Sequence, residues 1–292
     1  MNYKSKQLLE RCMEVVFLLS ALASIIAVLL ICVFMFAGGL PAIGKIGLFN
    51  FLGGTEWNPV REVPDFGILP MIVGSVYITA GSVLVGIPIG LLTAVFMARF
   101  CNRRLYAFIK PVVNLLAGIP SIVYGFFGMV VIVPLVRQLA GGTGKSILTA
   151  SILLGIMILP TVINISESAI RAVPQLYYEG ALALGATHER AVFTVLLPAA
   201  KSGVFASVVL GVGRAIGETM AVIMVAGNQP RITTNFLKGI RTLTANIVLE
   251  MGYSADLHRE ALLATGVVLF VFILIINTAF SILQNRREQR SR

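Results

Sequence analysis

The chain has 292 residues, of which 57% are hydrophobic and 12% are charged, and its mean hydropathy is +0.91. A soluble domain carries about 25% charged residues, so this composition excludes a soluble globular protein and indicates several membrane spans with short connections. The formal net charge of +10 does not indicate nucleic-acid binding, because the Lys and Arg residues gather at the ends of apolar runs. The three cysteines show no CxxC spacing and the two histidines lie far apart. We therefore expect no disulfide framework, no metal site and no cofactor.

Six apolar runs predict six transmembrane helices in an all-α membrane protein. The predicted spans are residues 15–37, 70–98, 111–136, 147–165, 201–227 and 261–283. The first run is longer than a signal-peptide core, so we expect a retained span, with cleavage near Ala37 as the alternative. With both termini cytoplasmic, 14 of the 23 Lys and Arg residues fall in inner segments and 8 in outer segments. This bias is the one that the positive-inside rule predicts.

Glycine and proline interrupt two of the predicted spans. Gly86 and Gly90 lie four residues apart in the second span, which predicts a close approach of another helix. Pro120 lies in a Gly-rich part of the third span. Such residues are tolerated in a membrane helix where neighbours or a water-filled path satisfy the freed backbone groups. The sequence thus predicts a broken or flexible helix beside a pathway, although close helix packing explains the glycines equally well.

Between the fourth and fifth spans, residues 166–200 form a loop with polar residues at its tip, and several residues in it stand at characteristic spacings. Its fixed positions are Glu179, Gly180, Ala181, Gly185, Leu197 and Pro198. The spacing resembles the EAA loop of ABC-importer permeases, the segment that docks on the cytoplasmic ATPase. Gly180 stands where that family has its second Ala, and Val195 stands where it has Ile. We expect a short helix opened by Pro174 and ended by Gly185 in a left-handed turn; an ordinary amphipathic helix is the alternative.

Arg214 and Glu218 are the charged residues in the interior of the fifth predicted span, which begins at Lys201. In a continuous helix they lie one turn apart on one face, and a charge at a membrane helix centre costs about 2.5–3.5 kcal/mol, so both are functional candidates. Gly213 and Gly217, beside them at four-residue spacing, predict a close-packed helix interface along this face. One interpretation is a self-neutralising ion pair that pins two helices together. The other makes Arg214 part of an anion pathway.

The pathway interpretation follows from the chemistry of the two side chains. A guanidinium has five donors and keeps its proton, so Arg214 can meet an oxyanion with donors left over for Glu218. Glu218 then prevents tight retention of the anion, since passage requires weak occupancy. Near neutral pH phosphate still carries a proton that a carboxylate can accept, whereas sulfate does not. We therefore expect Glu218 to favour phosphate over sulfate.

Beyond these features, longer strings resemble the phosphate-specific branch of the ABC-importer permeases, the PstC type. The strings lie at residues 115–128, 158–161, 179–187, 196–200 and 213–222. The resemblance implies the type I importer permease fold, in a bacterial or archaeal plasma membrane. It also implies a division into a first span with an external segment (1–69), a permease domain (70–284) and a basic tail (285–292).

The same resemblance implies the partners and the activity. We expect a heterodimer with a second, PstA-like permease, two PstB-like ATPases beneath it and a PstS-like binding protein outside. The chain is then a non-catalytic subunit that conducts inorganic phosphate while its partners hydrolyse ATP. The alternatives are a permease for another oxyanion or small solute, an intramembrane enzyme acting on a lipid phosphate, and a structural or signalling membrane subunit.

Overall fold

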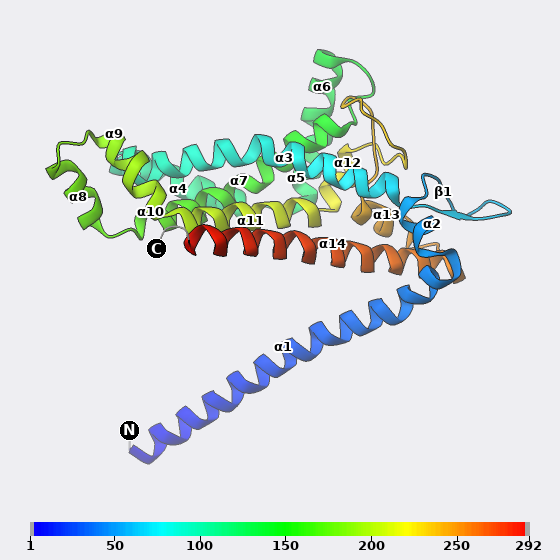
Figure 1. The fold of residues 1–292 in the computed structure, drawn as a ribbon, viewed down its shortest axis with the longest axis horizontal. Coiled ribbons are helices and arrows are strands. Elements are labelled where there is room, and N and C mark those ends of the chain that lie inside the picture. The colour runs from blue at the N-terminus through cyan, green and yellow to red at the C-terminus, as the bar shows by residue number, and fades with distance from the viewer. Residues whose placement is uncertain (1–2, 290–292) are drawn as a thin grey trace.

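The computed structural model describes residues 3–289, and in them the regular secondary structure is helical apart from one small hairpin and one isolated bridge (Figure 1). The long helices are α1 (Tyr3–Ile46), α3 (Leu69–Val95), α4 (Arg103–Gly118), α7 (Ile147–Arg171), α11 (Lys201–Gly217) and α14 (Asp256–Gln289). The short helices are α2 (Leu48–Gly53), α5 (Ser121–Phe127), α6 (Val133–Ala140), α8 (Gln175–Ala183), α9 (His188–Ala191), α10 (Leu197–Ala199), α12 (Met220–Val225) and α13 (Leu243–Glu250). Three π-helical turns and two strands complete the fold: η1 (Phe96–Phe100), η2 (Gly128–Ile132), η3 (Val192–Leu196), β1 (Trp57–Asn58) and β2 (Asp65–Phe66).

Five helical segments of the described chain are long and apolar enough to cross a membrane. They are Glu10–Ile46, Leu69–Phe100, Ser121–Ala140, Ile147–Arg171 and Asp256–Ile282. A sixth arises if His188–Ala199 and Lys201–Gly217, which meet at a bend of 70°, form one broken span. The predicted all-α membrane architecture is confirmed. The predicted basic tail (285–292) lies partly outside the described residues. Up to Gln289 it continues α14.

Two predicted spans differ from the structure in their boundaries. The run at 111–136 is not one helix: α4 ends at Gly118 and α5 begins at Ser121, after Pro120. Proline has no N–H and disfavours helical geometry in the residue before it, which explains this break. The run at 201–227 is also divided, because α11 ends at Gly217 and α12 begins at Met220.

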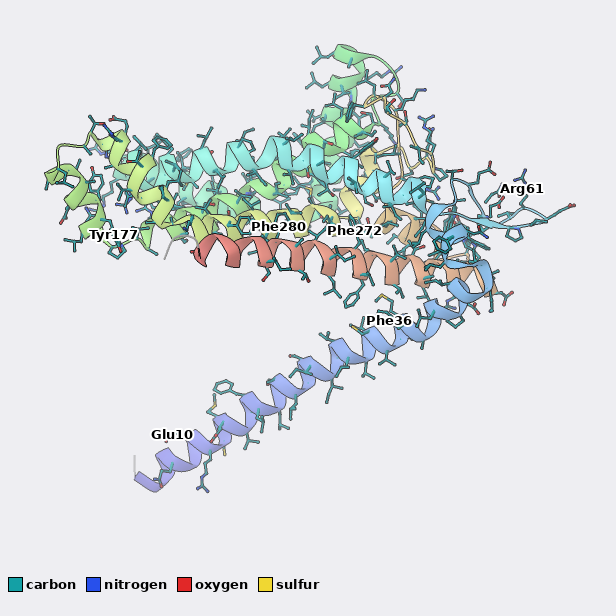
Figure 2. All side chains as sticks on the ribbon, viewed as in Figure 1. Glu10, Phe36, Arg61, Tyr177, Phe272 and Phe280 are labelled. Atoms are coloured by element: carbon teal, nitrogen blue, oxygen red, sulfur yellow. The ribbon has the colours of Figure 1, made fainter. Side chains whose placement is uncertain are left out.

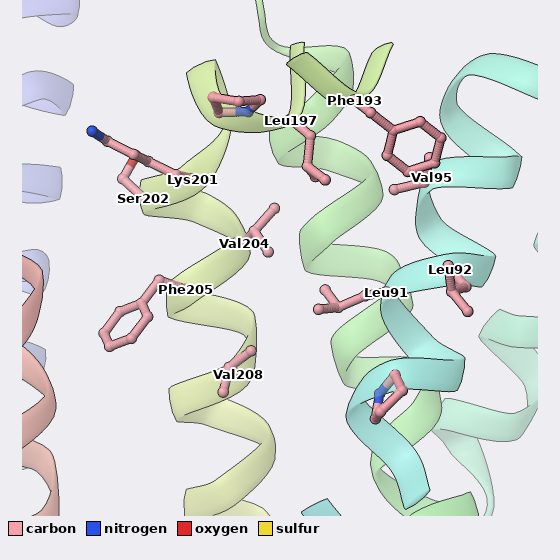
Figure 3. A pocket seen from close by; sticks show the side chains of 12 residues that line it. Leu91, Leu92, Val95, Phe193, Leu197, Lys201, Ser202, Val204, Phe205 and Val208 are labelled. Carbon is pink, nitrogen blue, oxygen red and sulfur yellow. The ribbon is translucent and has the colours of Figure 1, made fainter. Parts of the chain in front are cut away.

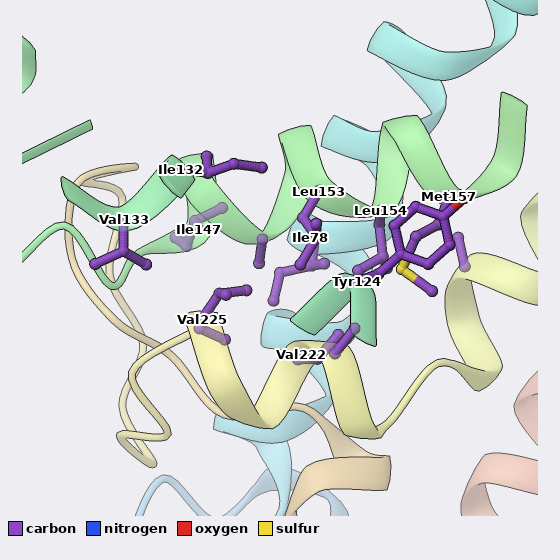
Figure 4. Packing of buried hydrophobic residues seen from close by; sticks show 14 of the residues in the cluster. Ile78, Tyr124, Ile132, Val133, Ile147, Leu153, Leu154, Met157, Val222 and Val225 are labelled. Atoms are coloured by element: carbon purple, nitrogen blue, oxygen red, sulfur yellow. The ribbon is translucent and has the colours of Figure 1, made fainter. Parts of the chain in front are cut away.

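The centre of the fold is the packing of α3 against α7. A Cβ placed on Gly86 would lie 2.6 Å from a side-chain carbon of Ile158, and one on Gly90 would lie 2.8 Å from Val162. Only glycine leaves room for these contacts, so the predicted close approach at both positions is confirmed. Figure 4 shows the adjoining apolar cluster, where Val222 and Val225 of α12 pack with Leu153 of α7.

Helix α1 diverges from the rest of the molecule (Figure 1). Near its end it meets α14, where the rings of Phe36 and Phe270 lie edge to face with centroids 5.9 Å apart and Gly39 packs on the backbone of Ala264. Figure 2 shows side chains on all sides of the remaining α1 turns, and most of these residues are exposed. This long apolar surface is the part of the chain most dependent on lipid or on another subunit for burial.

Candidate substrate pathway and coupling segment

The break between α4 and α5 leaves backbone carbonyls without helical partners. The Tyr124 hydroxyl donates to the carbonyl of Leu116 at 2.8 Å, across the break at Pro120. Tyr124 is itself buried, so a side chain from the following helix satisfies a group that the proline has freed. The predicted break at Pro120 is confirmed, and its role beside a pathway stays a prediction.

A second break lies at Glu218, which is extended with φ −70° and ψ 131°. Its carboxylate Oε1 accepts from the backbone N–H groups of Thr219 at 3.1 Å and Ala221 at 3.3 Å. These are orphan donors at the start of α12, so Glu218 acts as a helix cap. The Thr244 hydroxyl donates to the Glu218 carbonyl at 3.1 Å, which ties the break to α13.

This geometry corrects the expected arrangement of the charged pair. Arg214 and Glu218 do not share one face of a continuous helix, because the helix ends between them at Gly217. Among the described residues no carboxylate lies within 4.0 Å of the Arg214 guanidinium, so the self-neutralising pair is not formed. Its hydrogen bond is a long one, 3.5 Å from Nη1 to the Thr161 hydroxyl of α7. Half-buried Arg214 therefore keeps most of its five donors free.

The expected helix interface at Gly213 and Gly217 also needs correction. A Cβ placed on either glycine meets no atom within 4 Å in the described chain. Contacts inside this subunit therefore do not explain the spacing, and the surface beside Arg214 is open. Close packing occurs instead at Gly125 of α5, where a Cβ would lie 2.9 Å from the Ala221 Cα. The two helices that follow the two breaks thus lie directly against each other.

The polar-tipped loop contains α8, which has no buried residue and therefore exposes a smooth surface around Glu179, Gly180 and Ala181. Gly185 has φ +85°, as predicted, and it ends α8 in a Schellman motif. The Ala186 N–H bonds to the Ala181 carbonyl at 3.0 Å, and the Gly185 N–H bonds to the Leu182 carbonyl at 2.9 Å. The helix is thus closed by hydrogen bonds at the end that points away from the body.

Other members of the predicted motif lie elsewhere. Leu197 and Pro198 are in α10, at the bend before α11. They therefore lie between the loop and α11, not on the exposed surface of α8. Arg99, in η1 after α3, donates to the Gln175 side chain at 3.2 Å and to the Ile170 carbonyl at 3.2 Å. Arg99 thus links the end of α3 to the first residue of α8 and to the end of α7.

Comparison with known proteins matches residues 86–292 to the family described as the binding-protein-dependent transport system inner membrane component. The chain belongs to this family. The permease is 39% identical to a Bacillus subtilis protein named probable ABC transporter permease protein YqgH, covering 88% of this chain and 86% of that protein. It is 36% identical to the Mesorhizobium japonicum phosphate transport system permease protein PstC, covering 88% and 84%.

Solved structures show the same fold at lower identity. The permease matches an inward-facing methionine transporter, MetNI, with a TM-score of 0.62 and 22% identity over 75% of this chain and 95% of that one. It also matches a bacterial alginate transporter in complex with its periplasmic protein, with a TM-score of 0.65 and 17% identity over 94% and 96%. The permease is therefore an ABC importer subunit of the type I fold, a transport component.

Sequence reasoning missed a buried ionic cluster in the permease, centred on Glu167 of α7. This carboxylate is 1% exposed and bonds to Lys110 Nζ at 2.6 Å, to Arg171 Nε at 2.7 Å and to the Tyr106 hydroxyl at 2.7 Å. The bond to Glu167 is also the main reason that the pKa of Tyr106 is raised. The i,i+4 spacing of Glu167 and Arg171 was the available signal, but Lys110 and Tyr106 come from a distant helix. The cluster joins α4 to α7 just before the α8 loop.

Proposed function

We propose that this permease conducts inorganic phosphate as one of two membrane subunits of an ATP-driven importer. The observation that carries the proposal is Arg214: a half-buried guanidinium within the helical bundle, with free donors and an open surface beside it. Arginine binds oxyanions through several N–H groups at once, and its fixed charge needs no titration. The PstC names of several relatives support phosphate as that oxyanion.

Glu218 supplies the second element of the proposed pathway. Its Oε1 is engaged at the start of α12, while Oε2 makes no hydrogen bond to the described residues. An acceptor at this break suits an anion that still carries a proton. The carboxylate also opposes tight retention of the anion by Arg214, because transport requires release.

The partners follow from the same proposal. The open surface at Gly213 and Gly217 faces a second, PstA-like permease, and the exposed surface of α8 docks on one of two PstB-like ATPases. A PstS-like binding protein delivers phosphate from outside. Over the whole chain, 14 Lys and Arg residues fall in the segments on the α8 side of the predicted spans and 8 on the other side. This bias supports a cytoplasmic position for α8 and both termini, in a bacterial or archaeal plasma membrane.

Reconstitution tests this function. The permease is placed in vesicles with the second permease, the ATPase and the binding protein, and uptake of labelled phosphate is measured against labelled sulfate. ATP-dependent phosphate uptake that excess sulfate does not inhibit is expected. Preferential uptake of sulfate, or of another solute, would show that the permease serves a different substrate, and vesicles lacking the ATPase provide the control.

A further inference from the structure

An apolar groove of about 650 Å³ lies between α3 and α11, on the side of the bundle next to the bend at α10 (Figure 3). Its walls are apolar side chains from both helices, including Leu91 and Leu92 of α3 and Val204 and Val208 of α11. Phe193 of η3 closes the end next to the loop. The groove thus borders both sides of the 70° bend that precedes α11.

Lys201 lies at the end of this groove, at the first residue of α11 (Figure 3). In the part of the chain that the structure describes, no carboxylate lies within 4.0 Å of its ammonium group. Lys201 is exposed, and Ser202 next to it adds a hydroxyl to the same rim. Among the described residues, the groove therefore has a positive charge without a carboxylate partner at one end and apolar side chains along the rest.

The depth of these groups in the membrane follows from helix geometry. At a rise of ~1.5 Å per residue, Lys201 lies about 20 Å along α11 from Arg214, and Val208 lies about 10 Å along it from Lys201. The hydrocarbon core of a bilayer is about 30 Å thick. With Arg214 near the middle, Lys201 lies at the level of the lipid headgroups, and the groove descends from there into the hydrocarbon.

From this arrangement we infer that the groove binds an anionic phospholipid of the cytoplasmic leaflet, with its phosphate at Lys201 and one acyl chain along Val204 and Val208. The choice of leaflet rests on the orientation in the proposed function. Basic residues between membrane helices on the cytoplasmic side select anionic headgroups. A purely apolar helix of the second permease would fill the groove but would leave the Lys201 charge without a counter-ion, so charge complementarity favours the lipid.

Photolabelling of the assembled transporter tests this site. The complex is placed in phosphatidylcholine nanodiscs that contain phosphatidylglycerol with a photoreactive acyl chain, and labelled peptides are identified by mass spectrometry. Labels are expected on the α3 and α11 walls, with much weaker labelling by a phosphatidylcholine probe of the same chain. Lys201→Gln is expected to reduce phosphatidylglycerol labelling about fivefold. The matched control Arg190→Gln removes a nearby exposed charge outside the groove and should leave labelling unchanged.

A second variant examines the groove itself. Val208→Trp is expected to reduce labelling by both probes while the variant still co-purifies with its partner subunits. Equal labelling by the two lipids, unchanged labelling of Lys201→Gln, or cross-links from the groove walls to the second permease would overturn the inference. Labelling requires neither phosphate nor ATP, so these outcomes are separate from phosphate uptake. If the permease imports phosphate but its groove is not labelled, only the lipid site is rejected. If the groove is labelled but the transporter imports another solute, only the phosphate assignment is rejected.

Discussion

The carboxylate of Glu218 accepts a hydrogen bond from the backbone N–H of Ala221 at 3.3 Å, and this bond starts α12 where α11 has ended. Glu218, which the sequence suggests as half of an intramembrane ion pair, is thus a helix cap. Its second carboxylate oxygen, Oε2, has no hydrogen bond to the described residues. The capping role of Glu218 can therefore be tested separately from its proposed role toward the substrate.

Two substitutions at Glu218 separate these roles. Glu218→Gln keeps an acceptor for the two N–H groups, so the protein should assemble normally while its preference for phosphate over sulfate falls. Glu218→Leu removes the cap as well and should lower stability by about 1 kcal/mol more. The measurements are labelled-phosphate uptake with sulfate as competitor, and the thermal midpoint of the complex. If Glu218→Gln leaves both uptake and discrimination unchanged, the carboxylate has no role toward the anion.

Gly180 within α8 and Gly185 just after its end form a matched pair of positions. Gly185 has φ +85°, where a side chain is strained, so Gly185→Ala should cost roughly 1 kcal/mol and loosen the end of the helix. Gly180 lies inside the helix with no atom near its Cβ position, so Gly180→Ala should be neutral or slightly stabilising. Co-purification of the ATPase and phosphate-stimulated ATP hydrolysis measure the effect. Equal behaviour of the two variants would contradict a requirement for the ordered turn.

The Glu167 cluster should determine the stability of the region beside the loop. Glu167→Ala leaves Lys110 and Arg171 without their shared carboxylate, and we expect a loss of about 3 kcal/mol because the site is buried but both cations are partly exposed. The control is Glu260→Ala, whose partner Lys45 is an exposed cation, with an expected change within about 1 kcal/mol. Thermal unfolding of the detergent-solubilised protein measures the stability of both variants. Similar losses of stability in the two would contradict a special role for the buried cluster.

Gly86 and Gly213 differ in what surrounds them. Gly86→Leu should disrupt the subunit itself, because a Cβ there already lies 2.7 Å from the Gly155 carbonyl oxygen. Gly213→Leu meets open space in the isolated subunit, so it should fold normally and fail only in assembly with the second permease. Size-exclusion chromatography of the subunit alone and of the heterodimer distinguishes these cases. Normal assembly of Gly213→Leu would show that this surface is not an interface between the permeases.

The sequence predicts this fold where local chemistry decides the geometry. Pro120 cannot continue a helix, Gly185 is free to adopt φ +85°, and Gly86 marks a close helix contact, so each is recognisable without coordinates. The break at Glu218 is not, because glutamate fits a helix well and its extended backbone depends on Thr219, Ala221 and Thr244. The spacing of Gly213 and Gly217 predicts an interface but does not identify the partner.

Long-range contacts limited the prediction of the remaining site residues. Glu167 lies four residues before Arg171 in the sequence, yet Lys110, whose Nζ is 2.6 Å from the Glu167 carboxylate, belongs to α4. The Arg99 bond to Gln175 likewise joins the end of α3 to α8. Both contacts form only after the helices pack, so no local sequence pattern predicts them. These contacts connect the region around α8 to the bundle, where the proposed function requires motion of α8 to be transmitted.

The most direct test of the proposed pathway is phosphate uptake by Arg214→Ala in vesicles that contain all partner subunits, with Arg214→Lys beside it. Loss of the guanidinium should reduce uptake roughly 10- to 100-fold, the factor that corresponds to one hydrogen bond to a charged group, with assembly and basal ATP hydrolysis retained. Arg214→Lys should recover part of the uptake because it restores the charge without the fork of donors. Uptake by Arg214→Ala at the wild-type rate would show that phosphate crosses without this arginine and would contradict the proposed pathway.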